Sequence, residues 1–253
     1  MSPPVIASIV LICVAASAAL GLWLRDVLPE HHLAPETKEV VRLATGLVAT
    51  IAALVLSLLI SAAKTSFDRI DDELTDNAAK VLMLDRTLAE YGPATKEIRA
   101  LLKSSYAERI DRLFSGRKAE QNNANGARAA FIAESIDANL WALPAAGATQ
   151  DGLKARALQM NNDIDMTRAL MHSQREDTIP ATLLVVLVTW LVVIFATFSL
   201  FAPRNATVIA ALFVCALSAS GAILLILEMN TPFSGVINVS SLAMRETLSH
   251  LGE

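Results

Sequence analysis

The chain has 253 residues, 54% of them hydrophobic, and a formal net charge of −4. The high apolar content and the positive mean hydropathy suit a membrane protein far better than a globular one. Lys and Arg do not outnumber Asp and Glu, so the charge gives no reason to expect nucleic acid as a partner. The two cysteines, Cys13 and Cys215, both lie inside apolar runs, so we expect small buried apolar residues rather than a disulfide or a metal pair.

The first segment, Met1 to Leu24, carries no charge and is long enough to span a bilayer as a helix. A signal peptide is the alternative, because Ala16-Ser17-Ala18 resembles a small-residue cleavage site. A signal peptide requires a positive n-region, however, and no residue before Arg25 is charged. We therefore predict a spanning helix here.

The connection that follows is short and polar, and it contains Glu30, His31 and His32. Imidazole and carboxylate groups bind several divalent ions, but this spacing matches no standard zinc pattern. We therefore predict a polar cap at the membrane surface rather than a metal site. Pro35-Glu36 indicates the start of the next helix.

The second span runs from Leu43 to Ala63, twenty-one residues without a charge. Such a length crosses a hydrocarbon core about 30 Å thick. Lys64 to Arg69 follows without Gly or Pro, so we predict that this helix continues into water.

One side of this span is small or hydroxylated. Its members follow one another at steps of four, three, four and four: Gly46, Thr50, Ala53, Ser57 and Ser61. These steps place them on one helical face, while leucines cover much of the remainder. Small residues allow another helix to approach closely, and hydroxyl groups can instead face water in a pore. On these residues alone, helix packing is the favoured interpretation and a pore-facing stripe is the alternative.

Residues 64–177 differ sharply in composition, with sixteen of the twenty-one Lys and Arg and eighteen of the twenty-five Asp and Glu. Apolar residues alternate there at steps of three and four, a heptad seam with one polar member. The seam consists of Phe67, Ile70, Leu74, Asn77, Val81, Leu84, Leu88 and Tyr91. Gly92-Pro93 ends this helix, and three shorter helical patterns follow, with a polar loop predicted from Ser115 to Gly126.

Two further spans are predicted at Thr178–Pro203 and Asn205–Leu227. Val236 to Leu251 is too short and polar to span, so we expect it along the helical bundle or the membrane surface. The predicted fold is an all-α membrane protein with a helical cytoplasmic domain inserted between transmembrane helices 2 and 3. Its parts are residues 1–63 (helices 1 and 2), 64–177 (the helical domain), 178–228 (helices 3 and 4) and 229–253 (a C-terminal tail).

No motif indicates an enzyme. The chain has no Gly-rich phosphate loop, no His-Glu pair at metal spacing and no nucleophile elbow. Asp163, Asp165 and the run Asp71-Asp72-Glu73 are predicted to be solvated surface. We therefore expect no enzymatic activity, no cofactor and no metal.

Two local motifs resemble those of a known family. Thr65-Ser66-Phe67-Asp68-Arg69 is similar to the Ser-Tyr-x-Arg stretch that ends the second bestrophin helix. The run from Glu228 to Gly235 is similar to the Glu-x-x-x-Asn-Pro-Phe-Gly stretch after the fourth. The layout of four spans also resembles the bestrophins. Within that group, the runs Leu28 to Leu33 and Thr37 to Leu43 resemble a bacterial family called bestrophin-like. The resemblance to this bacterial family extends over nearly the whole chain.

Bestrophins are pentameric ion channels whose second helices line a narrow apolar neck. The resemblance therefore implies a homo-oligomer, most simply a pentamer, in the lipid bilayer of a bacterial inner membrane, with ions as its cargo. Counting back from Arg69 by the family's spacing reaches Ala53, Ser57 and Ser61, where bulky apolar residues are expected. This departure implies a wider and wetter pore, or one closed elsewhere. In calcium-gated bestrophins an acidic run follows the Pro-Phe-Gly motif. Here the uncharged residues 236–240 stand in its place, which argues against calcium gating through such a run.

The resemblance makes a single set of residues the candidate pore lining: Thr50, Ala53, Ser57, Ser61, Asp68 and Asp72. A ring of carboxylates at Asp68 and Asp72 would favour cations. The alternative function is a membrane-anchored interaction or scaffold protein whose helical domain binds a partner. A carrier is disfavoured, because the spans show no inverted repeat. The resemblance and a slight basic margin place the helical domain and both termini in the cytoplasm.

Overall fold

The computed structural model describes residues 2–29, 35–114, 120–144, 147–174, 181–203, 205–233 and 235–253. Within these ranges the chain is helical and contains no strand. It divides into two compact units. The first comprises Met1–Ser66 and Thr178–Thr231, and the second comprises Phe67–Asp177 and Pro232–Glu253.

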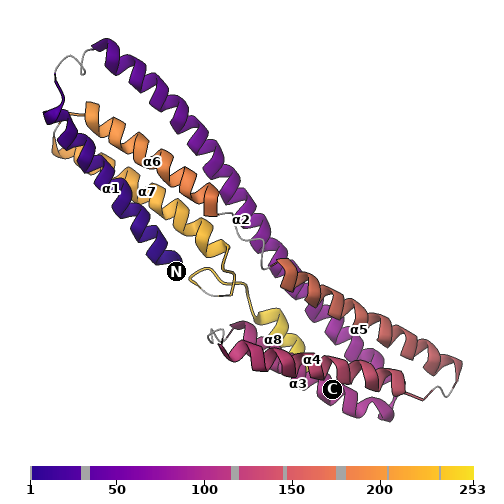
Figure 1. Ribbon diagram of the computed structural model, residues 1–253. Helices are drawn as coiled ribbons and strands as arrows, with labels where there is room; N and C mark the ends of the chain where they lie inside the picture. Colours follow the sequence, from indigo (N-terminus) through magenta and orange to yellow (C-terminus); the bar gives the residue numbers. More distant parts are fainter. Residues whose placement is uncertain are drawn as a thin grey trace. The chain divides into compact units, whose positions relative to one another are not determined.

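The first unit contains the apolar helices (Figure 1). They are α1 (Pro3–Val27), the first part of α2 (Pro35–Tyr91), α6 (Ala181–Phe201) and α7 (Ala206–Met229). The prediction of four helices long and apolar enough to cross a membrane is confirmed. Their ends follow local chemistry: α1 starts on Pro3, and the Asn205 side chain accepts a hydrogen bond from the Val208 N–H at 2.8 Å at the start of α7.

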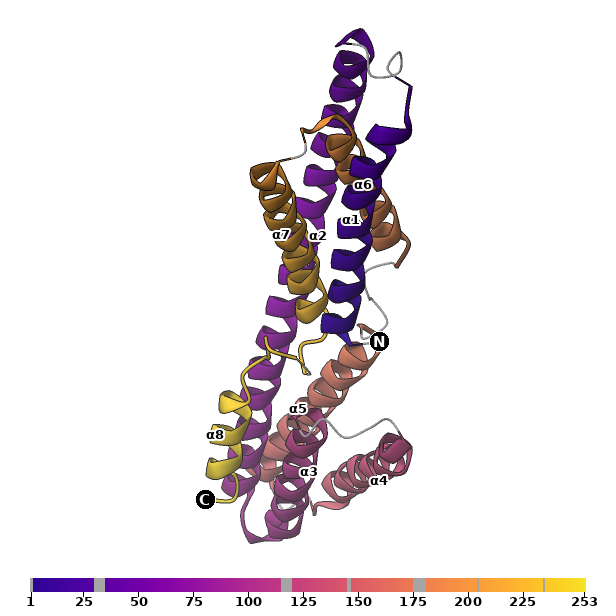
Figure 2. The ribbon, with the colours of Figure 1, turned by 90° about the vertical axis from the view of Figure 1, so that its left-hand side faces the viewer.

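Helix α1 packs against both α6 and α7 (Figure 2). The contact with α6 is close at Gly21, where an added Cβ would lie 2.3 Å from the Ala196 carbonyl oxygen. On α7, the buried Ser220 hydroxyl donates to the Ala7 carbonyl at 2.7 Å. Membrane helices associate through such small residues and interhelical hydrogen bonds, because lipid supplies no hydrophobic drive between helices.

Helix α2 belongs to both units and is continuous over 57 residues. At 1.5 Å per residue it is about 85 Å long, whereas a hydrocarbon core is about 30 Å thick. The prediction that the second span continues as a helix beyond the membrane is therefore confirmed. The helix ends at Gly92, whose φ of 114° is readily adopted only by glycine, followed by Pro93.

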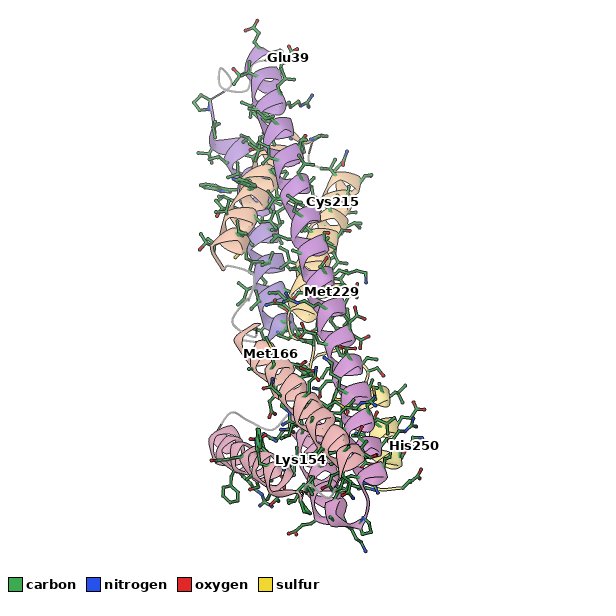
Figure 3. The ribbon with its side chains drawn as sticks, turned by 90° about the vertical axis from the view of Figure 1, so that its right-hand side faces the viewer. Glu39, Lys154, Met166, Cys215, Met229 and His250 are labelled. Carbon is green, nitrogen blue, oxygen red and sulfur yellow. The ribbon has the colours of Figure 1, made fainter. Side chains whose placement is uncertain are left out.

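The second unit is a bundle of the last part of α2 with α3 (Lys96–Phe114), α4 (Glu120–Ala142), α5 (Ala148–Gln174) and α8 (Leu242–His250). A short 3-10 turn, η2 (Pro93–Thr95), joins α2 to α3. The predicted heptad seam is confirmed as its core: six members from Leu74 to Tyr91 are buried, and Phe67 and Ile70 pack against them. Lys154 of α5 donates to the carbonyls of Trp141 and Leu143 at the end of α4, at 2.7 and 2.8 Å (Figure 3).

The prediction of a polar loop from Ser115 to Gly126 is wrong in its second part, because α4 begins at Glu120. Asparagine and glycine have low helix propensity, but propensity is a weak prior that tertiary context overrides. The tail follows one of its two expected courses. Val239, Met244 and Leu251 join the core of the second unit, and α8 packs on α3.

The expectation for the cysteines is also wrong in part. Cys13 and Cys215 are free thiols, as expected, but both side chains are exposed (Figure 3 labels Cys215 on α7). Each lies on a helix face turned away from the packed side of the first unit. A cysteine within an apolar run of the sequence is therefore not necessarily buried against other residues of its own subunit.

Candidate functional site

The membrane part of α2 has one face buried against the rest of the first unit. Thr45, Ala52, Leu59 and Ala63 are at most 6% exposed and follow one another at steps of seven, seven and four. This spacing keeps them on one line along the helix. Among the described residues, this is the side of α2 that packs within the subunit.

The candidate pore-lining residues of this span lie on the other side. Thr50, Ala53, Ser57 and Ser61 are all exposed, and among the described residues no helix of the same chain covers them. The residues alone favoured packing of this stripe against another helix. No described helix of the same subunit packs on it, so such a helix would have to come from another copy of the chain. We call these four residues the small-residue strip.

The hydroxyl groups of the strip differ in whether they have a hydrogen-bond partner within α2. The Thr50 hydroxyl donates to the Gly46 carbonyl at 2.9 Å, one turn earlier on α2. Thr50 is therefore satisfied within its own helix and requires neither a partner helix nor water. The argument for a polar partner outside the chain rests on Ser57 and Ser61.

A second strip runs beside the first on the exposed side of α2. Leu43, Leu47, Leu54 and Leu58 are 62–71% exposed. At 100° per residue these leucines are displaced around the helix from the small-residue strip. The exposed side of α2 is thus divided lengthwise into a small, partly polar strip and an apolar one, which suit two different surroundings.

Asp68 and Asp72, the last two candidate residues, belong to the second unit. Both side chains are exposed, unlike the buried seam residue Leu74 on the same helix. All six candidates therefore lie on one unbroken helix, and each of them is exposed within the part of the chain that the structure describes. Exposed hydroxyl and carboxylate oxygens are groups that can replace part of a cation's hydration shell. The other polar cluster considered, Glu30, His31 and His32, lies outside the described residues.

The motif after α7 has a defined structure in each unit. Glu228 is 3% exposed near the end of α7, in the first unit. In the second unit the Phe233 ring meets the Phe114 ring of α3 edge to face, with centroids 5.9 Å apart, and Gly235 has a φ of 150°. The aromatic and glycine positions of the motif therefore have structural roles, in packing the tail on α3 and in turning the chain.

A model of the bestrophin-like domain matches residues 12–244. The chain belongs to the bestrophin-like family. With its four apolar helices, this makes it an integral membrane protein.

The structure of this bestrophin-like chain is similar to the crystal structure of a point mutant of a bacterial bestrophin homologue from Klebsiella pneumoniae. The TM-score is 0.63 at 15% sequence identity, over 97% of this chain and 98% of that one. At that identity the likeness shows the bestrophin fold alone. No curated protein matches the sequence.

One group of polar residues was missed by the sequence reasoning. Asn77, Tyr106, Arg109 and Arg168 come from three helices of the second unit and lie within reach of one another. Their positions are tens of residues apart, so no local spacing reveals them. The single signal was Asn77, the polar member of an otherwise apolar seam.

Proposed function

We propose that this bestrophin-like protein is a homo-oligomeric ion channel of a bacterial inner membrane. The oligomer is most simply a pentamer, with one α2 helix from each subunit around a central axis. The observation that carries the proposal is the exposure of the small-residue strip, which no described helix of the same chain covers.

Lipid cannot satisfy the hydroxyls of Ser57 and Ser61, because a hydrocarbon core offers no hydrogen bonds. Water in a pore, or an α2 helix of a second copy, can do so. The neighbouring leucine strip then contacts lipid or an adjacent subunit. Family membership supports this arrangement, since bestrophins, which the chain resembles, are pentameric channels with second helices around the pore.

The lining that results from this arrangement is wider and more polar than a neck of bulky apolar residues. Alanine and serine have short side chains at Ala53, Ser57 and Ser61. The exposed carboxylates of Asp68 and Asp72 repeat in every subunit, and a ring of negative charge attracts cations and repels anions. We therefore propose selectivity for cations.

Cysteine substitution tests the lining directly. In a background with Cys13 and Cys215 replaced, Ser57→Cys and Ser61→Cys should react with small water-soluble thiol reagents and change the single-channel conductance in planar bilayers. Leu58→Cys, exposed on the neighbouring strip, is the matched control and should not react. Ala63→Cys, buried against the same subunit, is a second control.

Reaction at Leu58→Cys alone would place the pore elsewhere. A monomer in native mass spectrometry would contradict the ring as a whole. An anion-selective reversal potential would contradict the carboxylate ring and leave the remaining proposal standing.

A membrane-anchored interaction protein is the second candidate, and a specific observation favours it. Phe131 and Trp141 of α4 are 69% and 64% exposed, so two large aromatic side chains of the second unit are left without cover by the described residues. Partner binding through α4 predicts that Trp141→Ala weakens association without changing conductance. Absence of any conductance from a purified oligomer would favour this candidate over the channel.

A further inference from the structure

The chain that follows α7 forms a short loop with an apolar tip. The Val239 N–H donates to the Pro232 carbonyl at 3.0 Å, which brings the two ends of the loop together. Gly235, with its φ of 150°, turns the chain between them, and Val236 after it is 88% exposed. This is the highest exposed fraction among the large hydrophobic residues that the structure describes. We call residues 235–239 the tail loop.

The sequence around the tail loop carries no charge. From Met229 to Met244 there is no Lys, Arg, His, Asp or Glu, although residues 64–177 hold most of the charged residues of the chain. Leu242, in the same uncharged stretch, is 74% exposed. Exposed apolar side chains are unfavourable in water, whereas they suit the boundary between the headgroups and the acyl chains of a bilayer.

The tail loop begins directly after the end of a membrane span. Helix α7 has 24 residues and is about 36 Å long, whereas a hydrocarbon core is about 30 Å thick and a bilayer with its headgroups about 40–45 Å. A span of this length ends in the headgroup region, and its last residue is Met229 (Figure 3). Pro232 is three residues further on, so its Cα is at most about 11 Å from that of Met229. The Thr231 hydroxyl donates to the Leu227 and Glu228 carbonyls, both at 3.3 Å, which keeps the chain close to the end of α7.

Helix α7 exposes large apolar residues along its length. Five of them are 47–60% exposed: Ile209, Phe213, Val214, Leu217 and Leu225. This surface differs from the small-residue strip of α2 and suits lipid rather than water. The tail loop continues the chain from a helix whose exposed side faces lipid. Lipid is therefore the surroundings that we expect for the exposed tip of the loop as well.

We propose that Val236 inserts into the headgroup region of the bilayer and contacts lipid there. The tip is held on a fixed base, because the Phe233 ring packs on the Phe114 ring and Val239 joins the core of the second unit. The contact is apolar, so it shows no preference for anionic lipids, which attract basic side chains. It requires a membrane but no pore, and therefore stands independently of the proposed channel.

Site-directed spin labelling of the full-length protein in phosphatidylcholine liposomes tests the proposal. In a background with Cys13 and Cys215 replaced, Val236→Cys carries a nitroxide, and electron paramagnetic resonance measures its collisions with oxygen and with a water-soluble nickel chelate. Oxygen concentrates in lipid, whereas the chelate stays in water. Phe213→Cys, 57% exposed on α7, is the lipid reference, and Glu246→Cys, exposed on α8, is the water reference. We expect the ratio of oxygen to nickel collisions at Val236 to lie above that at Glu246 and below that at Phe213.

The other outcomes would each overturn the proposal. A ratio at Val236 equal to that at Glu246 would place the tip in water. An immobilised label with few collisions of either kind would mean that protein, such as a second copy of the chain, covers the tip. Replacing part of the phosphatidylcholine with phosphatidylglycerol should leave the ratio unchanged, and insertion only with the anionic lipid would contradict an apolar contact. The Glu246 control carries the same apolar label, so it also shows whether the label alone draws a position into lipid.

Discussion

Arg99 of α3 holds Asp85 of α2 by two hydrogen bonds, Nε to Oδ1 at 2.8 Å and Nη2 to Oδ2 at 2.7 Å. Asp85 is 2% exposed. The pair also binds the chain that follows α8, because the Gly252 N–H donates to Asp85 at 3.1 Å and Arg99 donates to the Glu253 carbonyl at 2.8 Å. One ion pair therefore joins α2, α3 and the tail.

Replacing Arg99 should destabilise the second unit strongly. Arg99→Gln leaves the Asp85 carboxylate buried without its cation, and breaking such a pair costs about 3 kcal/mol of unfolding free energy. Thermal unfolding of the purified protein in detergent measures the loss. Arg86→Gln, an exposed arginine of α2, should change the melting temperature little. Equal melting of the two variants would show that the pair contributes nothing.

Truncation of two adjacent residues of α2 should destabilise the protein by very different amounts. Leu84 is 0% exposed in the core of the second unit, and Leu84→Ala should cost about 2–5 kcal/mol. Met83 is 47% exposed on the same helix, so Met83→Ala should cost well under 1 kcal/mol. Chemical unfolding of both variants tests the seam, and similar costs would contradict its orientation.

The packing of α1 on α6 depends on the missing side chain at Gly21. A Cβ there would meet the backbone oxygen of Ala196, which cannot move as a side chain can, so Gly21→Ala should cost about 1–3 kcal/mol. Gly221→Ala on α7 has no atom within 4 Å of the added Cβ and should be neutral or stabilising. The comparison is made by thermal unfolding and size-exclusion chromatography. A neutral Gly21→Ala would mean that the helices are not so close.

Stability should fall at alkaline pH through Tyr106. Burial raises the pKa of its hydroxyl to about 12 in the folded protein, against an ordinary value near 10. The unfolded chain therefore loses this proton first, and the stability present below pH 10 is lost as pH rises through about 12. Tyr106→Phe removes this titration, so its melting temperature should fall less between pH 9 and pH 11 than that of the wild type. Parallel curves would contradict the shift.

The proposed orientation also has a direct test. A cysteine at Glu97, an exposed position on α3, should be shielded from an impermeant thiol reagent in intact cells if the second unit is cytoplasmic. Permeabilised cells provide the control, because the same cysteine should then react. Ready labelling in intact cells would reverse the topology.

The sequence determined the helices, because the signals that specify them are local. Uncharged runs predicted four spans, a stretch without Gly or Pro predicted that α2 continues past the membrane, and Gly92-Pro93 marked its end. The step of three and four residues from Phe67 to Tyr91 identified the core of the second unit. Each depends on composition or period along one element, which needs no knowledge of its neighbours.

Only the tertiary structure decided which neighbours those helices have. Small residues at Gly21 and Ser220 pack within the subunit, whereas Ser57 and Ser61, similar in size, are exposed. Cys13 and Cys215, in equally apolar runs, are exposed as well. In lipid, a packed face and an unpacked face of a helix are both apolar, so hydrophobicity does not distinguish them.

The polar cluster of the second unit, Asn77 with Tyr106, Arg109 and Arg168, shows the same limit. Asn77 is a single polar residue in its seam, and from the sequence alone each arginine would be predicted to lie on the exposed surface of its helix. Packing α2, α3 and α5 together brings Asn77, Tyr106 and the arginines to one place and removes their water. Which polar residues are buried together is a property of the assembled bundle rather than of any one helix.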